Sequence, residues 1–157
     1  MVSLCHHRAV LVTAEGNAFG YGGDIGSFLS QLDDLPSLIK QMTTTMHSAI
    51  ARLQRMDAPM VVAVQGVCAG GMAAFVAGCD IVVSADNARF VAAYTGIGYS
   101  CDASATVMFS RRMGLSRARN FLLRNQAFDA SAALAAGLVD EVVPADQLLV
   151  HAEKIAM

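Results

Sequence analysis

PMVVAVQGVCAGGMAAFVAGCDIVV, residues 59–83, is the stretch that decides the fold of this chain. Its run from Val61 to Val64 is apolar and rich in β-branched residues, which is typical of a buried strand. Glycines at 66, 70 and 71 then interrupt the run, and small or apolar residues follow up to Ala77. We expect a strand over 60–64, a tight turn over 66–70 and a short helix over 71–77, with 81–83 as the next buried strand.

A transmembrane helix is the alternative interpretation of the same stretch. No charged residue lies between Pro59 and Cys79, and Gly66 and Gly70 form a G-x-x-x-G pattern. Against this, residues 59–79 contain neither Leu nor Ile, carry Gln65 near the middle, and include four glycines that would weaken a lone helix. We therefore expect no membrane span.

Strands and helices alternate on both sides of this stretch. Apolar side chains at helical spacing from Ile39 to Leu53 predict a helix over 37–55. The other expected strands lie over 9–13, 90–91 and 138–143, with a glycine-rich loop over 16–24 and an irregular segment over 94–101. The other expected helices lie over 103–113, 116–125 and 130–136, followed by a final helix after Pro144. Gly137 ends the helix over 130–136. The pattern predicts a single domain over 1–157, an α/β fold with mainly parallel strands.

The composition predicts a covered apolar surface. Of the 157 residues, 55% are hydrophobic and 15% charged, and the mean hydropathy is +0.47. So apolar a chain would expose large patches as a monomer, and we expect either a homo-oligomer, whose other subunits cover them, or cover by further chain outside this sequence. The net charge of −2 gives no reason to expect nucleic acid. Five arginines gather locally and indicate either a solvated helix face or a landing site for phosphates: Arg111, Arg112, Arg117, Arg119 and Arg124.

The cysteines are scattered, at Cys5, Cys68, Cys79 and Cys101. Without a metal-type spacing they predict reduced thiols, a cytoplasmic protein and no metal site. Cys5-His6-His7 could catch a metal, but such a cluster without further ligands is more often incidental. No basic region followed by an apolar run opens the chain, so no signal peptide is expected.

Two glycine-rich segments carry the candidate chemistry. Neither is a nucleotide fingerprint, because Lys40 and Lys154 are the only lysines and residues 20–23 do not fit G-x-G-x-x-G. Glycine lets another group approach the backbone closely, and the second segment precedes a helix, whose free N–H groups favour negative charge. Two converging N–H groups could form an oxyanion hole for a thioester enolate. Tight packing turns explain the same glycines.

The order of residues around these glycines resembles the enoyl-CoA hydratase/isomerase (crotonase) family. Residues 19–25, FGYGGDI, are similar to its F-x-x-G-x-D loop, and residues 59–71 with 79–82 resemble its strand–glycine turn–helix signature. Residues 88–90 and 132–140 also match. The resemblance covers almost the whole chain from Ala9 onward. It implies an α/β ββα spiral core, usually trimeric or a dimer of trimers, that binds an acyl-CoA thioester and needs no cofactor beyond the coenzyme A of its substrate.

The same resemblance implies where a substrate binds. By motif, the oxyanion N–H groups fall on Gly23 and Gly71. The implied substrate-binding positions are Phe19, Gly22, Asp24, Gly70 and Tyr94.

The sequence departs from the hydratase pattern at both catalytic carboxylates. Ala74 and Tyr94 stand at the two positions, and neither is a carboxylate acid or base. Asp102 lies eight residues after Tyr94, where isomerases resembling ring-opening epoxyphenylacetyl-CoA isomerase have a catalytic Asp. It would suit a 1,3-proton shift. Asp102 is also well placed to N-cap the next helix.

His47 gives a third mechanism. Twelve residues before Pro59, it matches the general-base His of 4-chlorobenzoyl-CoA dehalogenase, whose nucleophilic Asp matches Asp102. A packing or surface role is the alternative for a helical His between Met46 and Ile50.

Relative to the resembled family, the chain is expected to lack the usual N-terminal strands and C-terminal helices. A non-catalytic acyl-CoA-binding or assembly protein is therefore the rival functional class. Tight acyl-CoA binding without turnover would distinguish it from an isomerase, a hydratase or a dehalogenase-type hydrolase.

Overall fold

A computed structural model describes residues 8–157, so Cys5-His6-His7 lies outside the described residues. The strands are β1 (Val10–Val12), β2 (Ala18–Gly20), β3 (Met60–Val64), β4 (Val67–Ala69), β5 (Ile81–Ala85), β6 (Arg89–Val91), β7 (Ala127–Asp129) and β8 (Glu141–Val143). The helices are α1 (Ile25–Ser30), α2 (Leu35–Leu53), α3 (Gly71–Ala77), α4 (Ala105–Met113), α5 (Leu115–Leu123), α6 (Ala130–Ala136) and α7 (Leu148–Ala156). Short 3₁₀ turns precede α2 and α7 and follow β6.

The strands form two four-stranded sheets that grow together along the chain. One has the order β1-β3-β5-β8 and the other β2-β4-β6-β7. The pairs β1–β2, β3–β4 and β5–β6 each give one strand to either sheet, which makes the successive turns of a spiral. All neighbours are parallel except β6 and β7, as the alternation of strands and helices predicts.

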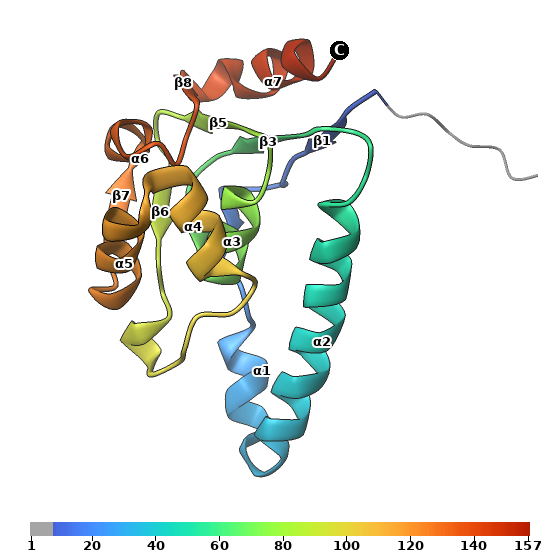
Figure 1. The fold of residues 1–157 in the computed structure, drawn as a ribbon, viewed down its shortest axis with the longest axis vertical. Helices are drawn as coiled ribbons and strands as arrows, with labels where there is room; N and C mark the ends of the chain where they lie inside the picture. The colour runs from blue at the N-terminus through green and yellow to red at the C-terminus, as the bar shows by residue number, and fades with distance from the viewer. Residues whose placement is uncertain (1–7) are drawn as a thin grey trace, which may run out of the picture.

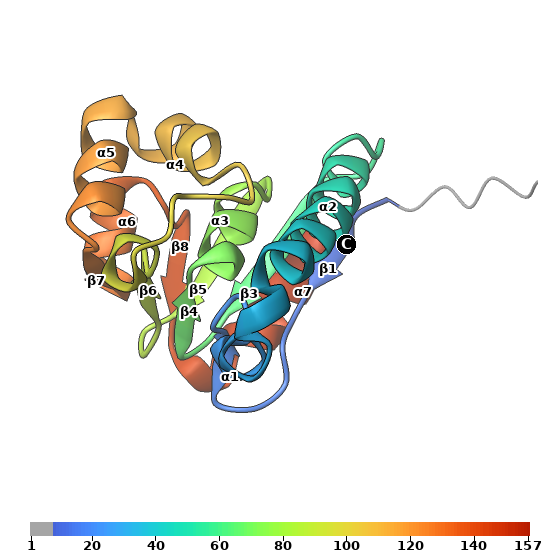
Figure 2. The same cartoon turned by 90° about the horizontal axis from the view of Figure 1, so that it is seen from below.

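The central strand β3 is buried on both faces, which explains its uninterrupted apolar sequence. Val61 and Ala63 face α7, where they pack with Leu148 and Ala152. Val62 and Val64 belong to the larger core on the opposite face, which includes α3, α4 and α5. Figures 1 and 2 show α7 on one side of this sheet and α3 on the other.

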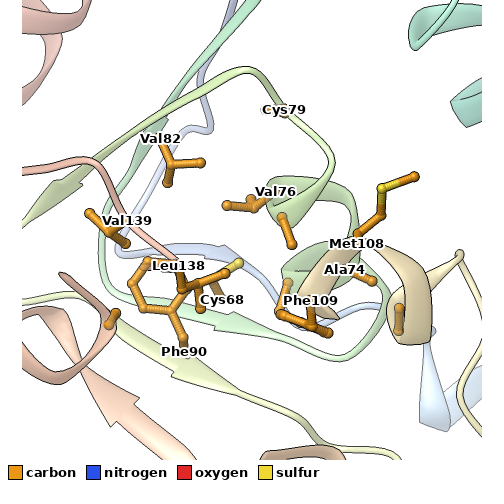
Figure 3. Close-up of a cluster of buried hydrophobic side chains, with 14 of the residues drawn as sticks. Cys68, Ala74, Val76, Cys79, Val82, Phe90, Met108, Phe109, Leu138 and Val139 are labelled. Carbon is orange, nitrogen blue, oxygen red and sulfur yellow. The ribbon is translucent and has the colours of Figure 1, made fainter. Parts of the chain in front are cut away.

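The larger core fills the space between the two sheets and the helices (Figure 3). Phe90 of β6, Phe109 of α4 and Phe121 of α5 are fully buried, and the rings of Phe109 and Phe121 lie 5.1 Å apart. Ala74 of α3 is also fully buried in this cluster. Each buried phenyl ring stabilises the fold by about 2–3 kcal/mol through its removal from water.

The longest helix, α2, stands beside this core and carries part of the candidate site (Figure 1). The chain descends through α1, turns, and runs back as α2. Ile50 is buried, and Met46 and Leu53 pack partly against the core. Their spacing over two turns is the apolar pattern that predicts the helix.

Several short elements differ from the sequence prediction. The predicted turn over 66–70 contains β4, and the predicted loop over 16–24 contains β2. Strand β7 lies outside all predicted elements. Three-residue strands have too few positions for a periodic pattern, and their pairing partners lie far along the chain. The predicted strand over 138–143 begins only at Glu141, because the N–H groups of Leu138 and Val139 donate to the carbonyl of Ala133 in α6.

Within residues 8–157, no helix combines the length and the apolar character that a membrane crossing requires. The stretch interpreted above as a candidate span is divided between β3, β4 and the seven-residue helix α3.

Candidate functional site

The two glycine-rich turns meet at one edge of the second sheet. They follow β2 and β4, which pair in parallel, so their carboxyl ends lie at the same edge. A Cβ added to Gly22, whose φ is +88°, would stand 3.0 Å from the backbone nitrogen of Gly71. A Cβ added to Gly70, with φ +55°, would stand 3.5 Å from the carbonyl oxygen of Tyr21. A side chain at Gly22 would press the two turns apart, whereas at Gly70 the contact is an ordinary one and the positive φ is what favours glycine.

Gly23 and Gly71 belong to these two turns. The neighbouring Gly70 uses its own N–H to donate to the carbonyl of Val91, and its carbonyl accepts from Ala74 at the start of α3. Among residues 8–157, by contrast, the Gly23 and Gly71 N–H groups have no protein acceptor. Two unpaired donors on turns that touch can bind one oxygen atom of a ligand.

Gly71 lies close to two side chains from other parts of the chain. A Cβ built on Gly71 would lie 3.8 Å from Sδ of Met46 and 4.0 Å from Oδ1 of Asp102. Both are ordinary contact distances. The packing of the protein therefore leaves room for a methyl group at residue 71, unlike the positions of Gly22 and Gly23.

At Gly23, an aromatic ring occupies the place that a side chain would take. A Cβ there would come within 2.7 Å of Cζ of Phe28 in α1. The Phe28 ring in turn meets the Tyr99 ring edge-on, with centroids 6.4 Å apart. Helix α1 and the role of Phe28 were not predicted, although Ile25, Phe28 and Leu29 have the i, i+3, i+4 spacing of a helix face.

Asp102 does not cap the following helix, so the N-cap prediction is wrong. The N-cap of α4 is Ser104, and no side chain accepts a hydrogen bond from that helix end. The Asp102 carbonyl, not its carboxylate, accepts the Ala105 N–H at 2.8 Å. The reason is a left-handed turn: Ala103 and Ser104 have φ of 49° and 61°, which places the N-cap two residues past Asp102.

Tyr94 lies beneath this turn and touches Asp102. It is 6% exposed, and its hydroxyl donates to the Asp102 carbonyl oxygen at 3.5 Å. Burial raises the pKa of Tyr94 far above its usual range, and the negative charge of Asp102 and a hydrogen bond to it raise it further. The phenol therefore stays neutral. The thiol beside the carboxylate, Cys101, also has a raised pKa through burial and the same charge.

His47 reaches the same turn from α2. Its Nε2 accepts the backbone N–H of Ala103 at 3.0 Å, across 56 residues of sequence. Residues 102–103 thus lie beside groups from three parts of the chain: Gly71 and Tyr94 are next to Asp102, and His47 bonds to Ala103. Met46, the residue before His47, was not among the predicted site residues.

Two other predicted substrate-binding side chains have structural contacts. Phe19 is buried in the larger core. The Asp24 carboxylate caps α1, accepting the Ser27 N–H at 3.2 Å and the Ser27 hydroxyl at 2.6 Å. The hydroxyl bond and then the N–H bond lower the pKa of Asp24. The pattern Asp-x-x-Ser before a helix could have indicated this cap.

Two of the clustered arginines also have partners within the fold. Arg112 makes a bidentate bond to Asp140, with Nη1 at 2.8 and 2.7 Å from its oxygens, and donates through Nη2 to the carbonyls of Cys79 and Asp80. Arg117 donates to the carbonyls of Ala135 and Ala136. These two side chains serve packing between helices and strands.

Comparison with known proteins gives a consistent picture. The family model for enoyl-CoA hydratase/isomerase matches residues 5–157. A trans-2-decenoyl-[acyl-carrier-protein] isomerase of Streptococcus mutans is 28% identical over 90% of this chain and 54% of the relative. A 4-chlorobenzoyl coenzyme A dehalogenase of Arthrobacter sp is 30% identical over 85% of this chain and 49% of the relative. The crystal structure of an enoyl-CoA hydratase from Polaromonas sp. JS666 superposes with a TM-score of 0.88 at 29% identity, over 95% of this chain and 58% of that one. The chain spans about half the length of these relatives.

Proposed function

The chain belongs to the enoyl-CoA hydratase/isomerase (crotonase) family, and from this premise we propose that it converts an enoyl-CoA thioester by an isomerase-type proton transfer. The two glycine turns bind the thioester carbonyl. Asp102 is the one acidic group that moves the proton.

The thioester oxygen binds to the N–H groups of Gly23 and Gly71. Two observations support this. A Cβ built on Gly22 would stand only 3.0 Å from the Gly71 nitrogen, so the turns lie close together, and neither N–H has a protein acceptor among residues 8–157. Negative charge grows on this oxygen when a proton leaves the neighbouring carbon. Donors already in place stabilise that charge more in the transition state than in the bound substrate.

The two positions at which a hydratase of this family has its catalytic carboxylates hold Ala74 and Tyr94 in this chain. Ala74 has no ionisable group and is buried in the core. Tyr94 is neutral, because burial and Asp102 raise its pKa. Activation of water by two carboxylates is therefore not part of the proposal.

The proposed step is a 1,3-proton shift. The Asp102 carboxylate removes a proton from the α carbon of an enoyl thioester whose double bond begins at the β carbon. The electron pair of that bond enters the conjugated system, which becomes a dienolate held by Gly23 and Gly71. The carboxyl group returns the proton to the γ carbon, two carbons away, so the double bond moves and no atom is gained or lost.

The observation that carries the proposal is the Asp102 carboxylate beside Gly71, 4.0 Å from the position of its missing Cβ and unused as a helix cap. The test is solvent deuterium incorporation into an enoyl-CoA. Asp102→Asn should lower the exchange rate on the order of 10²–10⁴-fold, the contribution of a positioned acid or base. Asp57→Asn, at an exposed acid beyond the end of α2, is the control and should leave exchange unchanged.

The outcomes distinguish the functional classes. Equal exchange by the parent and Asp102→Asn would exclude Asp102 as the acid–base group. If the parent binds acyl-CoA tightly and neither exchanges nor converts it, a non-catalytic acyl-CoA-binding protein is the better description.

A dehalogenase-type reaction is the second candidate, favoured by the Asp102 carboxylate beside Gly71, where it could act as a nucleophile. One relative, the Arthrobacter protein, is named for that activity. In this reaction the Asp102 carboxylate would attack the ring carbon, chloride would leave, and water would hydrolyse the aryl ester. Intact-mass detection of an adduct on Asp102 would support it.

We also propose a homo-oligomer, a trimer or hexamer, acting in the cytoplasm. Large apolar side chains are exposed on several helices, among them Val107, Leu115, Leu123, Leu134, Leu149 and Val150. Another copy could cover this surface. Cys68, Cys79 and Cys101 are free thiols, which suits a reducing compartment.

A further inference from the structure

We propose that His47 is a positioning residue rather than a base: its ring accepts the Ala103 N–H and so holds the turn that keeps the Asp102 carboxylate beside Gly71. This role deepens the proposed function and rests on the assignment of Asp102 as the proton carrier. It is distinct from the general-base role that the dehalogenase resemblance implies for the same residue.

The hydrogen bond fixes which ring nitrogen of His47 carries the proton. A backbone N–H can only donate, so Nε2 of His47, 3.0 Å from the Ala103 nitrogen, must present its lone pair. The ring proton of the neutral imidazole is then on Nδ1. A general base would need a lone pair directed at a water molecule. At Nε2 that lone pair is already engaged, and taking up a proton there would release Ala103.

The turn that His47 holds has an unfavourable backbone. Ala103 and Ser104 are consecutive non-glycine residues in the left-handed region, with φ of 49° and 61°. Such a conformation persists only where the surroundings impose it. Here the Asp102 carbonyl is held by the Ala105 N–H at 2.8 Å and by the Tyr94 hydroxyl at 3.5 Å. His47 holds the other side of the same peptide unit, which joins Asp102 to Ala103.

The helix that carries His47 is anchored in the core by neighbouring residues, while the His47 side chain itself lies at the surface. One residue before it, Met46 packs against the core and faces Gly71, and Ile50, nearly one turn later, is 7% exposed. His47 is exposed. Its replacement should therefore change the Asp102 turn without unfolding the helix or the core.

Two substitutions separate holding from proton transfer. In His47→Gln the amide oxygen can reach the position of Nε2 and accept the Ala103 N–H, but it is not a base. In His47→Asn the side chain is one bond shorter and its oxygen stands near the position of Nδ1. Each variant should be measured in three ways: hydrogen exchange of the Ala103 amide by NMR, the ¹³C shift of the Asp102 carboxyl carbon, and deuterium incorporation into an enoyl-CoA.

We expect Gln to preserve all three observables and Asn to change all three. Loss of one hydrogen bond should reduce the protection of the Ala103 amide by roughly 2- to 10-fold. Displacement of the carboxylate should lower substrate exchange on the order of 10²-fold. Ser48→Ala, at the next exposed position of α2, is the control for a general effect on the helix.

Three results would overturn the inference. The Ala103 amide could be unprotected in the parent. The Asn variant could keep the parental carboxyl shift. The Gln variant could keep amide protection but lose turnover, which would identify His47 as a base. If the parent shows no exchange with any enoyl-CoA, the proposed function fails by itself. Amide protection and the carboxyl shift would still decide whether His47 positions Asp102.

Discussion

Replacing Gly71 by Ala should make the protein more stable and less active. Gly71 is the first residue of α3, and its φ lies outside the left-handed region. The new Cβ would meet Sδ of Met46 at 3.8 Å and Oδ1 of Asp102 at 4.0 Å, so nothing in the fold needs to move. Alanine restricts the unfolded chain, and the free energy of unfolding should rise by about 0.4–1 kcal/mol. The same methyl group would stand between the Gly71 backbone and the carboxylate, where the substrate must lie.

The kinetic effect should have the opposite sign. A thioester moved away from one oxyanion donor should lose on the order of 10²–10³ in exchange rate. Gly71→Val should lose more, because its added methyl groups approach Met46 and Asp102 further. Urea unfolding and deuterium incorporation, measured on the same preparations, give the two numbers. A stable Gly71→Ala protein with parental exchange would refute the binding of substrate at Gly71, and a destabilised one would refute the packing described here.

Three further predictions concern the fold and its assembly. Arg112→Met should lower the free energy of unfolding by about 2 kcal/mol, because the substitution removes the charged donor from the Asp140 carboxylate and from the carbonyls of Cys79 and Asp80. An unchanged urea midpoint would contradict this. Asp129 caps α6, and its bonds to the Ala132 N–H and then the Ser131 hydroxyl lower its pKa from the usual value of an Asp, so its stabilising charge is present at neutral pH and lost as pH falls through that lowered pKa. Asp129→Asn keeps a capping oxygen, so the stability difference from the parent should be larger at about pH 6 than at about pH 3; an equal difference would exclude the charge. Sedimentation at micromolar concentration should show an oligomer, and a well-behaved monomer would contradict the covered apolar surface.

Much of the fold could be predicted because its determinants are local. The buried strand, the glycines and the short helix of residues 59–77 have recognisable patterns, and the observed β3 and α3 match the predicted bounds. The predicted helix over 37–55 is found at 35–53. The α/β spiral core inferred by resemblance is confirmed by the superposition on solved relatives. Strands of three residues, such as β4, were missed because pairing with distant segments decides them.

The site was less predictable for a physical reason. Motif position indicated Gly23, Gly71 and Asp102, but the local pattern also made Asp102 a plausible helix cap, and only the left-handed turn at Ala103 excludes that role. The bond from Ala103 to His47 joins residues 56 apart and depends on how α2 packs. No periodicity or spacing in the sequence encodes such a contact.

The most direct test of the thioester site is the ¹³C NMR shift of an acyl-CoA labelled at its thioester carbonyl and bound to the protein. Donation by the Gly23 and Gly71 N–H groups polarises the carbonyl, so the bound signal should move downfield from that of free acyl-CoA. The shift should shrink in Gly71→Val under saturating ligand. A bound carbonyl with the shift of the free thioester would contradict the assignment of these two glycines as the oxyanion site.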